Sequence, residues 1–218
     1  MNVTMTDIKK LREQTGAGLA DCKKALAEAE NYEGAVEIIR KKGQAVAAKR
    51  SDREASEGCV LAKIDGTFGA IIALKCETDF VANNADFVAL TREILDAAVA
   101  ARCHTLEEVK ALPMGNATIA DAVVDRSGIT GEKMELDGYC VVEGEEICMY
   151  NHQNKNFLCT MVQLNKSNDE VGHELTLKVA ETAPVALDEA AVPQEVKDTE
   201  LKVAIEKTKE EQVRKAVE

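Results

Sequence analysis

The chain has 218 residues, a formal net charge of −12 at pH 7, 45% hydrophobic residues and 30% charged residues. Nucleic-acid binding depends on basic side chains that neutralise phosphates, so this charge argues against direct contact with nucleic acid. No apolar run approaches the roughly 20 residues of a membrane-spanning helix. The N-terminus also lacks the basic start and apolar stretch of a signal peptide. We therefore expect a globular cytoplasmic protein with no membrane partner.

The cysteines and histidines show no pattern of a metal site. The number of cysteines is odd, at seven, no two of them form a C-x-x-C pair, and the three histidines are far apart in the sequence. P-loop, dinucleotide-binding and nucleophile-elbow motifs are also missing from the sequence. We expect free thiols in a reducing compartment, with no metal and no cofactor.

Residues 1–54 differ in charge from the rest of the chain. They hold 11 basic and 9 acidic residues, a balance of +2, whereas residues 55–218 hold 16 and 30, a balance of −14. Within the first segment, apolar residues at helical spacing predict helices over residues 4–15, 19–29 and 33–48. We expect a three-helix N-terminal domain over residues 1–54.

The next segment begins with a predicted linker over residues 49–58, which are polar and aperiodic. Apolar runs at residues 59–64 and 68–74 then flank Asp65-Gly66-Thr67, a strong signal of a β-hairpin. Apolar stripes predict three further helices, over residues 86–101, 106–112 and 119–126. We expect Gly128 to close the last of these.

The second half of the chain returns to strands. Alternating patterns predict strands over residues 133–142, 146–150 and 157–164, with a polar turn at residues 151–156 and a helix over residues 170–182. Strands followed by helices, twice and in antiparallel order, make the fold class α+β.

From residue 193 to residue 218 the sequence predicts one highly charged helix. Val196, Val203, Ala216 and Val217 are spaced for a narrow apolar seam, as in one strand of a coiled-coil hairpin. The pattern shows no helix cap at residue 218, so we expect a chain that is cut there.

Residues 71–84 predict a buried strand that runs into a sharp corner, where Asp79 and Phe80 stand side by side. A phenylalanine at a strand end is ordinarily a core residue. Here Asn83-Asn84 favour a turn or helix cap, and Phe87 is available to fill the core instead. The neighbours leave two places open for Phe80, the core and an exposed corner.

Two hypotheses concern chemistry at this corner. Glu77 and Asp79 would face the same side of a continuing strand as an acid pair or half a metal site. No further oxygen ligand is visible nearby, so a solvated corner is the simpler interpretation. Cys76 lies close to both carboxylates, which disfavour a thiolate, so we expect a buried strand cysteine rather than a nucleophile.

Leu19 and Ala20 follow a glycine-rich turn at the start of the second helix. An exposed apolar spot there would serve as a docking contact. Packing in the core of the bundle is an equal alternative for both residues.

Two sequence motifs carry a family resemblance. The first is LREQTGAGLADCKKAL at residues 11–26, and the second is TDFVANN at residues 78–84. Together and in this order they resemble the bacterial elongation factor Ts family. The likeness is strong over residues 5–101 and continues weakly to the end of the chain.

This resemblance implies a domain organisation. Residues 1–54 would form a ubiquitin-associated-like bundle, and residues 55–138 and 139–192 would form two core subdomains, the second incomplete. Residues 193–218 would be the first helix of a coiled-coil hairpin. The return helix and the end of the second subdomain would then lie beyond a truncated chain.

The resemblance also implies a function, that of a guanine-nucleotide exchange factor for elongation factor Tu rather than an enzyme. Such a factor binds the complex of elongation factor Tu with GDP, disturbs its Mg²⁺ and phosphate site, and promotes GDP release and GTP loading. The segment that displaces Mg²⁺ would be Thr78, Asp79, Phe80 and Val81. The docking residues would be Leu19, Ala20 and His152. A homodimer is left open.

Two other classes of function are compatible with the residues. In the first, the three-helix domain is a pure interaction module that binds a partner without changing nucleotide release. In the second, the protein is an enzyme that uses Cys76 or the Glu77 and Asp79 pair. The residues support the enzyme least.

Overall fold

The computed structural model describes residues 3–152 and 155–217, the last five of them without side chains. The chain forms two compact units, residues 1–180 and residues 181–218. Helices and antiparallel strands both occur in the first unit, so the fold is of the α+β class that the sequence predicts.

Three helices form a small bundle at the N-terminus, α1 (Met5–Thr15), α2 (Leu19–Glu28) and α3 (Tyr32–Lys49). The Thr4 hydroxyl and the Asp7 carboxylate form a capping box at the start of α1, and Gly16, with a φ of 70°, ends it. The three helices predicted from the sequence are confirmed to within one or two residues. The buried side chains of the bundle form a separate hydrophobic cluster: Ile8, Leu11, Ala17, Cys22, Ala25, Leu26, Ala29 and Ala35.

An antiparallel three-stranded sheet forms the centre of the first unit, in the order β1 (Glu57–Asp65), β2 (Phe68–Cys76) and β5 (Glu135–Glu143). The predicted hairpin is confirmed, since β1 and β2 pair with Asp65 opposite Phe68. The turn between them uses Gly66 at a φ of 59°, a conformation that glycine adopts without strain. The central position of β2 explains why its apolar run is nearly continuous.

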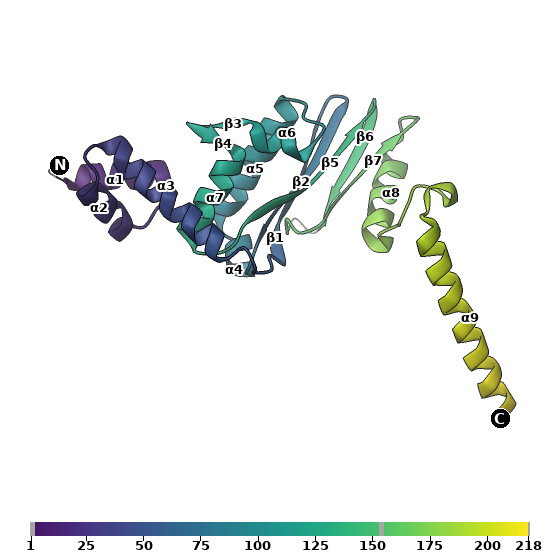
Figure 1. Cartoon of the computed structure of the whole chain (residues 1–218). Helices are drawn as coiled ribbons and strands as arrows, with labels where there is room; N and C mark the ends of the chain where they lie inside the picture. Colours follow the sequence, from purple (N-terminus) through teal and green to yellow (C-terminus); the bar gives the residue numbers. More distant parts are fainter. Residues whose placement is uncertain (1–2, 153–154, 218) are drawn as a thin grey trace. The chain divides into compact units, whose positions relative to one another are not determined.

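The sheet is covered on both faces (Figure 1). Helix α5 (Ala85–Ala100) packs against β1 and β2 on one face, and the hairpin of β6 (Glu146–Asn151) and β7 (Cys159–Leu164) packs on the other. Helix α8 (Asp169–Thr182) lies on the outer side of that hairpin. The layers approach closely, because a Cβ added to Gly69 would overlap Met161 and one added to Gly172 would overlap Cys148.

The N-terminal bundle is joined to the sheet core by the crossing of α3 with α7 (Ile119–Thr130). The two backbones meet at glycines, since a Cβ on Gly128 would overlap the Cα of Gly43. The prediction that Gly128 closes its helix is therefore wrong: α7 continues through it and ends at Gly131, which has a φ of 74°. The glycine at residue 128 is needed for close packing rather than for a helix stop.

Several short elements complete the first unit. Helix α6 (Leu106–Ala111) is confirmed. The sequence does not predict the single helical turn α4 (Asp79–Ala82) or the small ladder of β3 (Pro113–Met114) with β4 (Ala117–Thr118). Elements of two to four residues are too short to show a periodic pattern.

The second unit consists of a short 3₁₀ turn, η2 (Glu189–Ala191), and the long helix α9 (Gln194–Val217). The charged helix is thus confirmed, and along it Leu201, Val203 and Ile205 are exposed. The side chains of Ala216 and Val217, two of the four predicted seam residues, lie outside the described residues. Within the described part of the chain, no helix combines the length and apolar character needed to cross a membrane.

Candidate functional site

The single turn α4 presents Phe80 to solvent. The Phe80 side chain is 85% exposed, whereas Phe68 and Phe87 are almost completely buried. Asp79, its neighbour, is also exposed. Of the two places that the sequence leaves open for Phe80, the structure therefore shows the exposed corner, and Phe87 fills the core as expected.

Local hydrogen bonds build this turn between β2 and α5. The Thr78 hydroxyl caps α4 by accepting a hydrogen bond from the Val81 amide at 3.4 Å. The Asn83 side chain donates to the Asp79 carbonyl at 2.8 Å, and Asn84 caps α5. Val81 packs against the core, so the turn is buried on one side while Asp79 and Phe80 face outward.

Below the turn, the Glu132 side chain holds Thr78 and the residue before it. One carboxylate oxygen of Glu132 accepts from the backbone amides of Glu77, at 3.2 Å, and Thr78, at 3.1 Å. The other oxygen accepts from the Thr78 hydroxyl at 2.6 Å. Two hydrogen bonds thus link the loop after α7 to Thr78, which caps α4, and a third links it to Glu77.

A second carboxylate completes the link from the opposite side. Glu77 accepts a hydrogen bond from the Lys133 amide at 2.6 Å, which with Arg50 lowers its pKa below the ordinary value of 4.5. Its two oxygens lie 2.8 and 2.9 Å from an Arg50 guanidinium nitrogen. We call the bonds among Glu77, Thr78, Glu132 and Lys133 the clasp.

These contacts correct two predictions. Glu77 is not part of a solvated corner, because its side chain is only 12% exposed and bound to Arg50 and the Lys133 amide. Residues 49–58 are not a free linker either. The Lys133 ammonium donates to the carbonyls of Ser51 and Arg53 at 2.9 Å each, so the segment after α3 is attached to the core.

Cys76 has the environment of a structural thiol. It is fully buried at the end of β2, and burial, together with the nearby Glu132 carboxylate, raises its pKa to about 12. Its thiol donates to the Thr78 carbonyl at 3.2 Å. A thiol that stays protonated at neutral pH is a poor nucleophile, which agrees with the expectation of a buried strand cysteine.

The other predicted site residues lie on different elements. Leu19, 46% exposed, and Ala20, also exposed, form the first turn of α2. Asp21, next in the chain, pairs with Lys42 of α3 at 2.5 Å, which fixes this end of α2 against α3. Neither Leu19 nor Ala20 belongs to the bundle core, so both side chains are free to meet a partner.

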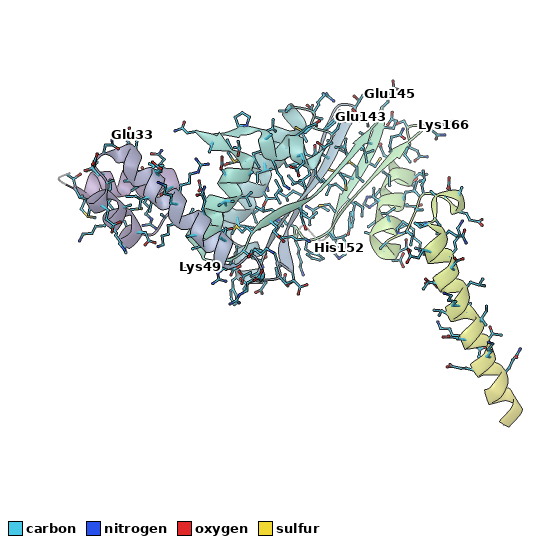
Figure 2. The ribbon with its side chains drawn as sticks, in the orientation of Figure 1. Glu33, Lys49, Glu143, Glu145, His152 and Lys166 are labelled. Atoms are coloured by element: carbon cyan, nitrogen blue, oxygen red, sulfur yellow. The ribbon has the colours of Figure 1, made fainter. Side chains whose placement is uncertain are left out.

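His152 lies where the chain leaves β6 (Figure 2). Its Nδ1 is 3.0 Å from the Tyr150 hydroxyl, and its ring meets that of Phe157 edge to face at 5.6 Å. The His152 amide donates to the Leu158 carbonyl at 2.9 Å. The imidazole is half-buried in an aromatic cluster whose Phe157 ring is 53% exposed.

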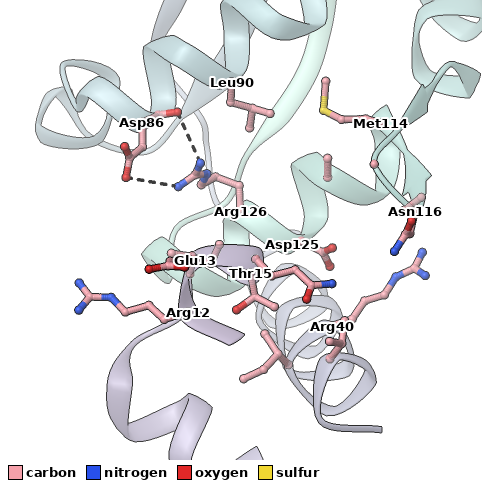
Figure 3. Close-up of a pocket in the computed structure, with 18 of the residues that line it drawn as sticks. Arg12, Glu13, Thr15, Arg40, Asp86, Leu90, Met114, Asn116, Asp125 and Arg126 are labelled. Carbon is pink, nitrogen blue, oxygen red and sulfur yellow. Dashed lines mark hydrogen bonds and ion pairs between the residues drawn. The ribbon is translucent and has the colours of Figure 1, made fainter. Parts of the chain in front are cut away.

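A cleft of about 1100 Å³ is lined by residues of α1 and α3 from the bundle and of α5 and α7 from the core. Arg126 of α7 reaches Asp86 of α5 across one side (Figure 3), and Arg40 of α3 pairs with Asp121. Burial raises the pKa of Asp125, one oxygen of which is buried without a hydrogen-bond partner among the described residues. Acidic and basic side chains line the cleft in equal number, so it shows no preference for the charge of a ligand.

In the described part of the chain, no three His, Cys, Asp or Glu side chains come close enough together to hold a metal ion.

Sequence reasoning missed Glu132, Lys133 and Arg50 as parts of the site. Their partners Glu77 and Thr78 are separated from them by 27 to 56 positions. No local pattern signals such pairs.

Comparison with known proteins places this chain in a family. The profile of the family described as Elongation factor TS matches residues 77–218, which include the clasp and the exposed turn. The chain belongs to the elongation factor Ts family, a family of translation elongation factors.

Curated relatives named elongation factor Ts match all or nearly all of this chain. An elongation factor Ts of Parabacteroides distasonis is 68% identical over 219 residues, which cover 100% of this chain and 67% of the relative. One of Bacteroides thetaiotaomicron is 66% identical over 220 residues, with the same shares covered. One of Porphyromonas gingivalis is 49% identical over 213 residues, covering 96% of this chain and 77% of the relative.

Proposed function

We propose that this chain is a guanine-nucleotide exchange factor for elongation factor Tu. It binds the complex of elongation factor Tu with GDP, disturbs the Mg²⁺ and phosphate site, and promotes GDP release and GTP loading. It acts without covalent chemistry, as a binding protein rather than an enzyme. Membership of the elongation factor Ts family supports this proposal.

The exposure of Phe80 carries the proposal. Burying a phenylalanine side chain stabilises a protein by roughly 1.5–3 kcal/mol, and at 85% exposure Phe80 gains little of this in the free chain. That free energy is available when the ring enters a pocket of a partner. An exposed aromatic on a turn held by four hydrogen bonds also loses little conformational freedom on binding.

The proposed mechanism acts on the metal of the partner. GDP in such a GTPase is held partly through Mg²⁺, which bridges the phosphates to protein ligands. The inserted Phe80 ring forces apart side chains that support those ligands, and without the metal the phosphate charge is less well neutralised. The Asp79 carboxylate competes with the phosphates for the same hydrogen-bond donors of the partner. Thr78 and Val81 complete the contact segment and hold the turn in place.

The factor turns over because coupling between two ligands is reciprocal. If the chain weakens nucleotide binding by a given ratio, nucleotide weakens binding of the chain by the same ratio. GTP that binds to the emptied site therefore expels the chain. Couplings of this kind typically amount to about 5- to 150-fold.

The proposal also includes the docking residues and the domain organisation of the chain. Leu19 and Ala20 form one docking contact, and His152 forms another.

Residues 1–54 act as the N-terminal domain, residues 55–138 and 139–192 as two core subdomains, and residues 193–218 as one helix of a coiled-coil hairpin. The boundary after residue 138 falls within β5, so the two proposed subdomains share that strand. We place the protein in the cytoplasm, where translation takes place, and leave its oligomeric state open.

The test is the rate at which fluorescently labelled GDP leaves elongation factor Tu in the presence of this chain. We expect the chain to accelerate release, and Phe80→Ala to lower the maximal rate by about tenfold, within the range typical of such coupling. Wild-type rates with Phe80→Ala would exclude the ring as the wedge.

A matched control removes a different exposed apolar side chain. Leu187 is 99% exposed and lies outside the proposed contact residues, so Leu187→Ala removes apolar surface without changing their sequence. We expect wild-type release rates from this variant. If the chain binds elongation factor Tu without changing GDP release, the alternative of a pure interaction module holds instead.

A further inference from the structure

The turn that carries Phe80 is too short to keep its own orientation. Helix α4 has four residues, and the first hydrogen-bonded turn of a helix is unfavourable without further support. Its apolar side supplies part of that support through Val81 and the buried Ala82. The start of the turn, from which Asp79 and Phe80 project, must be held by other contacts.

Those contacts converge on Glu132. Its two carboxylate oxygens take the Thr78 amide at 3.1 Å and the Thr78 hydroxyl at 2.6 Å, and one of them also takes the Glu77 amide at 3.2 Å. Holding the amide and the hydroxyl of one residue fixes both its backbone and its side-chain torsion. Thr78 is the cap of α4, so the direction of the next two residues follows from this anchor.

The reciprocal half of the clasp keeps Glu132 in place. The Lys133 amide donates to Glu77 at 2.6 Å, so the two chain segments are cross-linked in both directions. The Lys133 ammonium holds two carbonyls after α3, and Arg50, the C-cap of α3, holds Glu77. The end of the N-terminal bundle and the Phe80 turn therefore share one set of hydrogen bonds.

We propose that Glu132 is a positioning residue for exchange, which orients Phe80 through Thr78 without itself touching the partner's nucleotide site. This inference rests on the proposed function. On this view the clasp determines the maximal rate of GDP release, and the other docking surfaces determine the affinity for elongation factor Tu. Removing the hydrogen bonds of the clasp should then lower the maximal rate and leave the affinity nearly unchanged.

The first test uses the free chain alone. The sequence contains no tryptophan, so Phe80→Trp places a single indole on the turn. We expect time-resolved fluorescence anisotropy to show a larger fast component when Glu132→Gln is added to Phe80→Trp. Glu132→Gln keeps one of the two oxygens that accept hydrogen bonds, and Glu132→Ala removes both. The fast component should therefore be larger in Glu132→Ala than in Glu132→Gln.

Glu107→Gln is the matched control, since Glu107 is 82% exposed on α6. It should leave the anisotropy decay of Phe80→Trp unchanged. An unchanged decay in both Glu132 variants would overturn the inference.

The second test measures labelled GDP release from elongation factor Tu with Phe80 intact. We expect Glu132→Gln to lower the maximal rate by about tenfold and to change the half-saturating concentration by less than about twofold. A purely structural role would lower the active fraction and leave the maximal rate per folded molecule unchanged. An unchanged maximal rate would overturn the positioning role.

Failure of the proposed function looks different from failure of this inference. If the unsubstituted chain does not accelerate GDP release, the exchange proposal fails, and the anisotropy decay alone decides whether Glu132 holds the turn. If Glu132→Gln does not fold, hydrogen exchange on the unsubstituted chain replaces it. The Glu77 and Thr78 amides should exchange at least about tenfold more slowly than in an unstructured peptide, and unprotected amides would contradict the clasp.

Discussion

At the scale of single residues, two carboxylates link the residues just before the turn that exposes Phe80 to the loop after α7. Glu132 and Glu77 each accept backbone amides from the opposite segment, and neither lies in an exposed position like that of Asp79. Buried or half-buried carboxylates are stable only when they are paired or hydrogen-bonded. Here the pairing has a second result, since it binds the residues that precede the turn with the exposed aromatic.

The stability of the chain should depend on the ionisation of Glu77. Its pKa is lowered in the folded state, chiefly by the Lys133 amide, so its contribution is present above the ordinary value of 4.5 and is lost as pH falls through the lowered value. We expect Glu77→Gln to lower the free energy of unfolding by about 1 kcal/mol at neutral pH, a figure reduced for solvent screening of Arg50. The difference from wild type should shrink as pH falls below 4.5.

Urea unfolding followed by circular dichroism, at neutral and acid pH, measures this difference. Glu107→Gln serves as the control, because its exposed side chain should give little change at either pH. A difference between Glu77→Gln and wild type that stays constant across the two pH values would contradict the linkage.

At the scale of elements, the crossing of α3 with α7 determines how the N-terminal bundle meets the sheet core. The helices touch through Gly43 and Gly128, which lets their backbones approach more closely than any side chain would allow. Helix α3 has 18 residues and is therefore about 27 Å long. Its first half packs in the bundle and its end reaches Glu77, so it connects α2 to the clasp.

Gly128→Ala should separate these two helices. The added Cβ would overlap backbone atoms of Gly43, which cannot move aside as a flexible side chain could. We expect a loss of about 1–3 kcal/mol in the free energy of unfolding, typical of overpacking. Urea unfolding provides the measurement.

Gly34→Ala is the matched control in the same helix pair. A Cβ there would meet the Asn31 side chain at 3.2 Å and no backbone, and alanine favours a helix more than glycine does. Its stability should stay within about 1 kcal/mol of wild type. Equal stabilities for Gly128→Ala and wild type would show that the crossing can relax.

Elements with a local signal could be predicted, and those that depend on distant partners could not. The hairpin around Asp65-Gly66-Thr67 and the helices of the bundle follow from turn residues and apolar spacing. Gly128 has the same local appearance as a helix stop, and only its contact with Gly43 shows that it is a packing residue. The clasp joins residues about fifty positions apart, so Glu77 looks solvated until Lys133 is in place.

At the scale of the whole molecule, the residues that the proposed function needs lie on separate elements of the first unit. The first turn of α2 carries Leu19 and Ala20, the turn α4 carries Phe80, and the half-buried His152 follows β6. The sequence predicts these residues through the family resemblance rather than through composition. The structure adds that Leu19 and Phe80 are exposed and that Cys76 is buried. The roles of the exposed residues stay predictions.

The central claim is that this chain acts catalytically on nucleotide release, and a turnover measurement tests it most directly. Labelled GDP is bound to elongation factor Tu in molar excess over the chain, and unlabelled GTP is added in large excess. We predict that all of the label is released, at a rate proportional to the concentration of the chain, because GTP expels the chain after each exchange. Release at the spontaneous rate, or a burst limited to one GDP for each chain, would contradict the account.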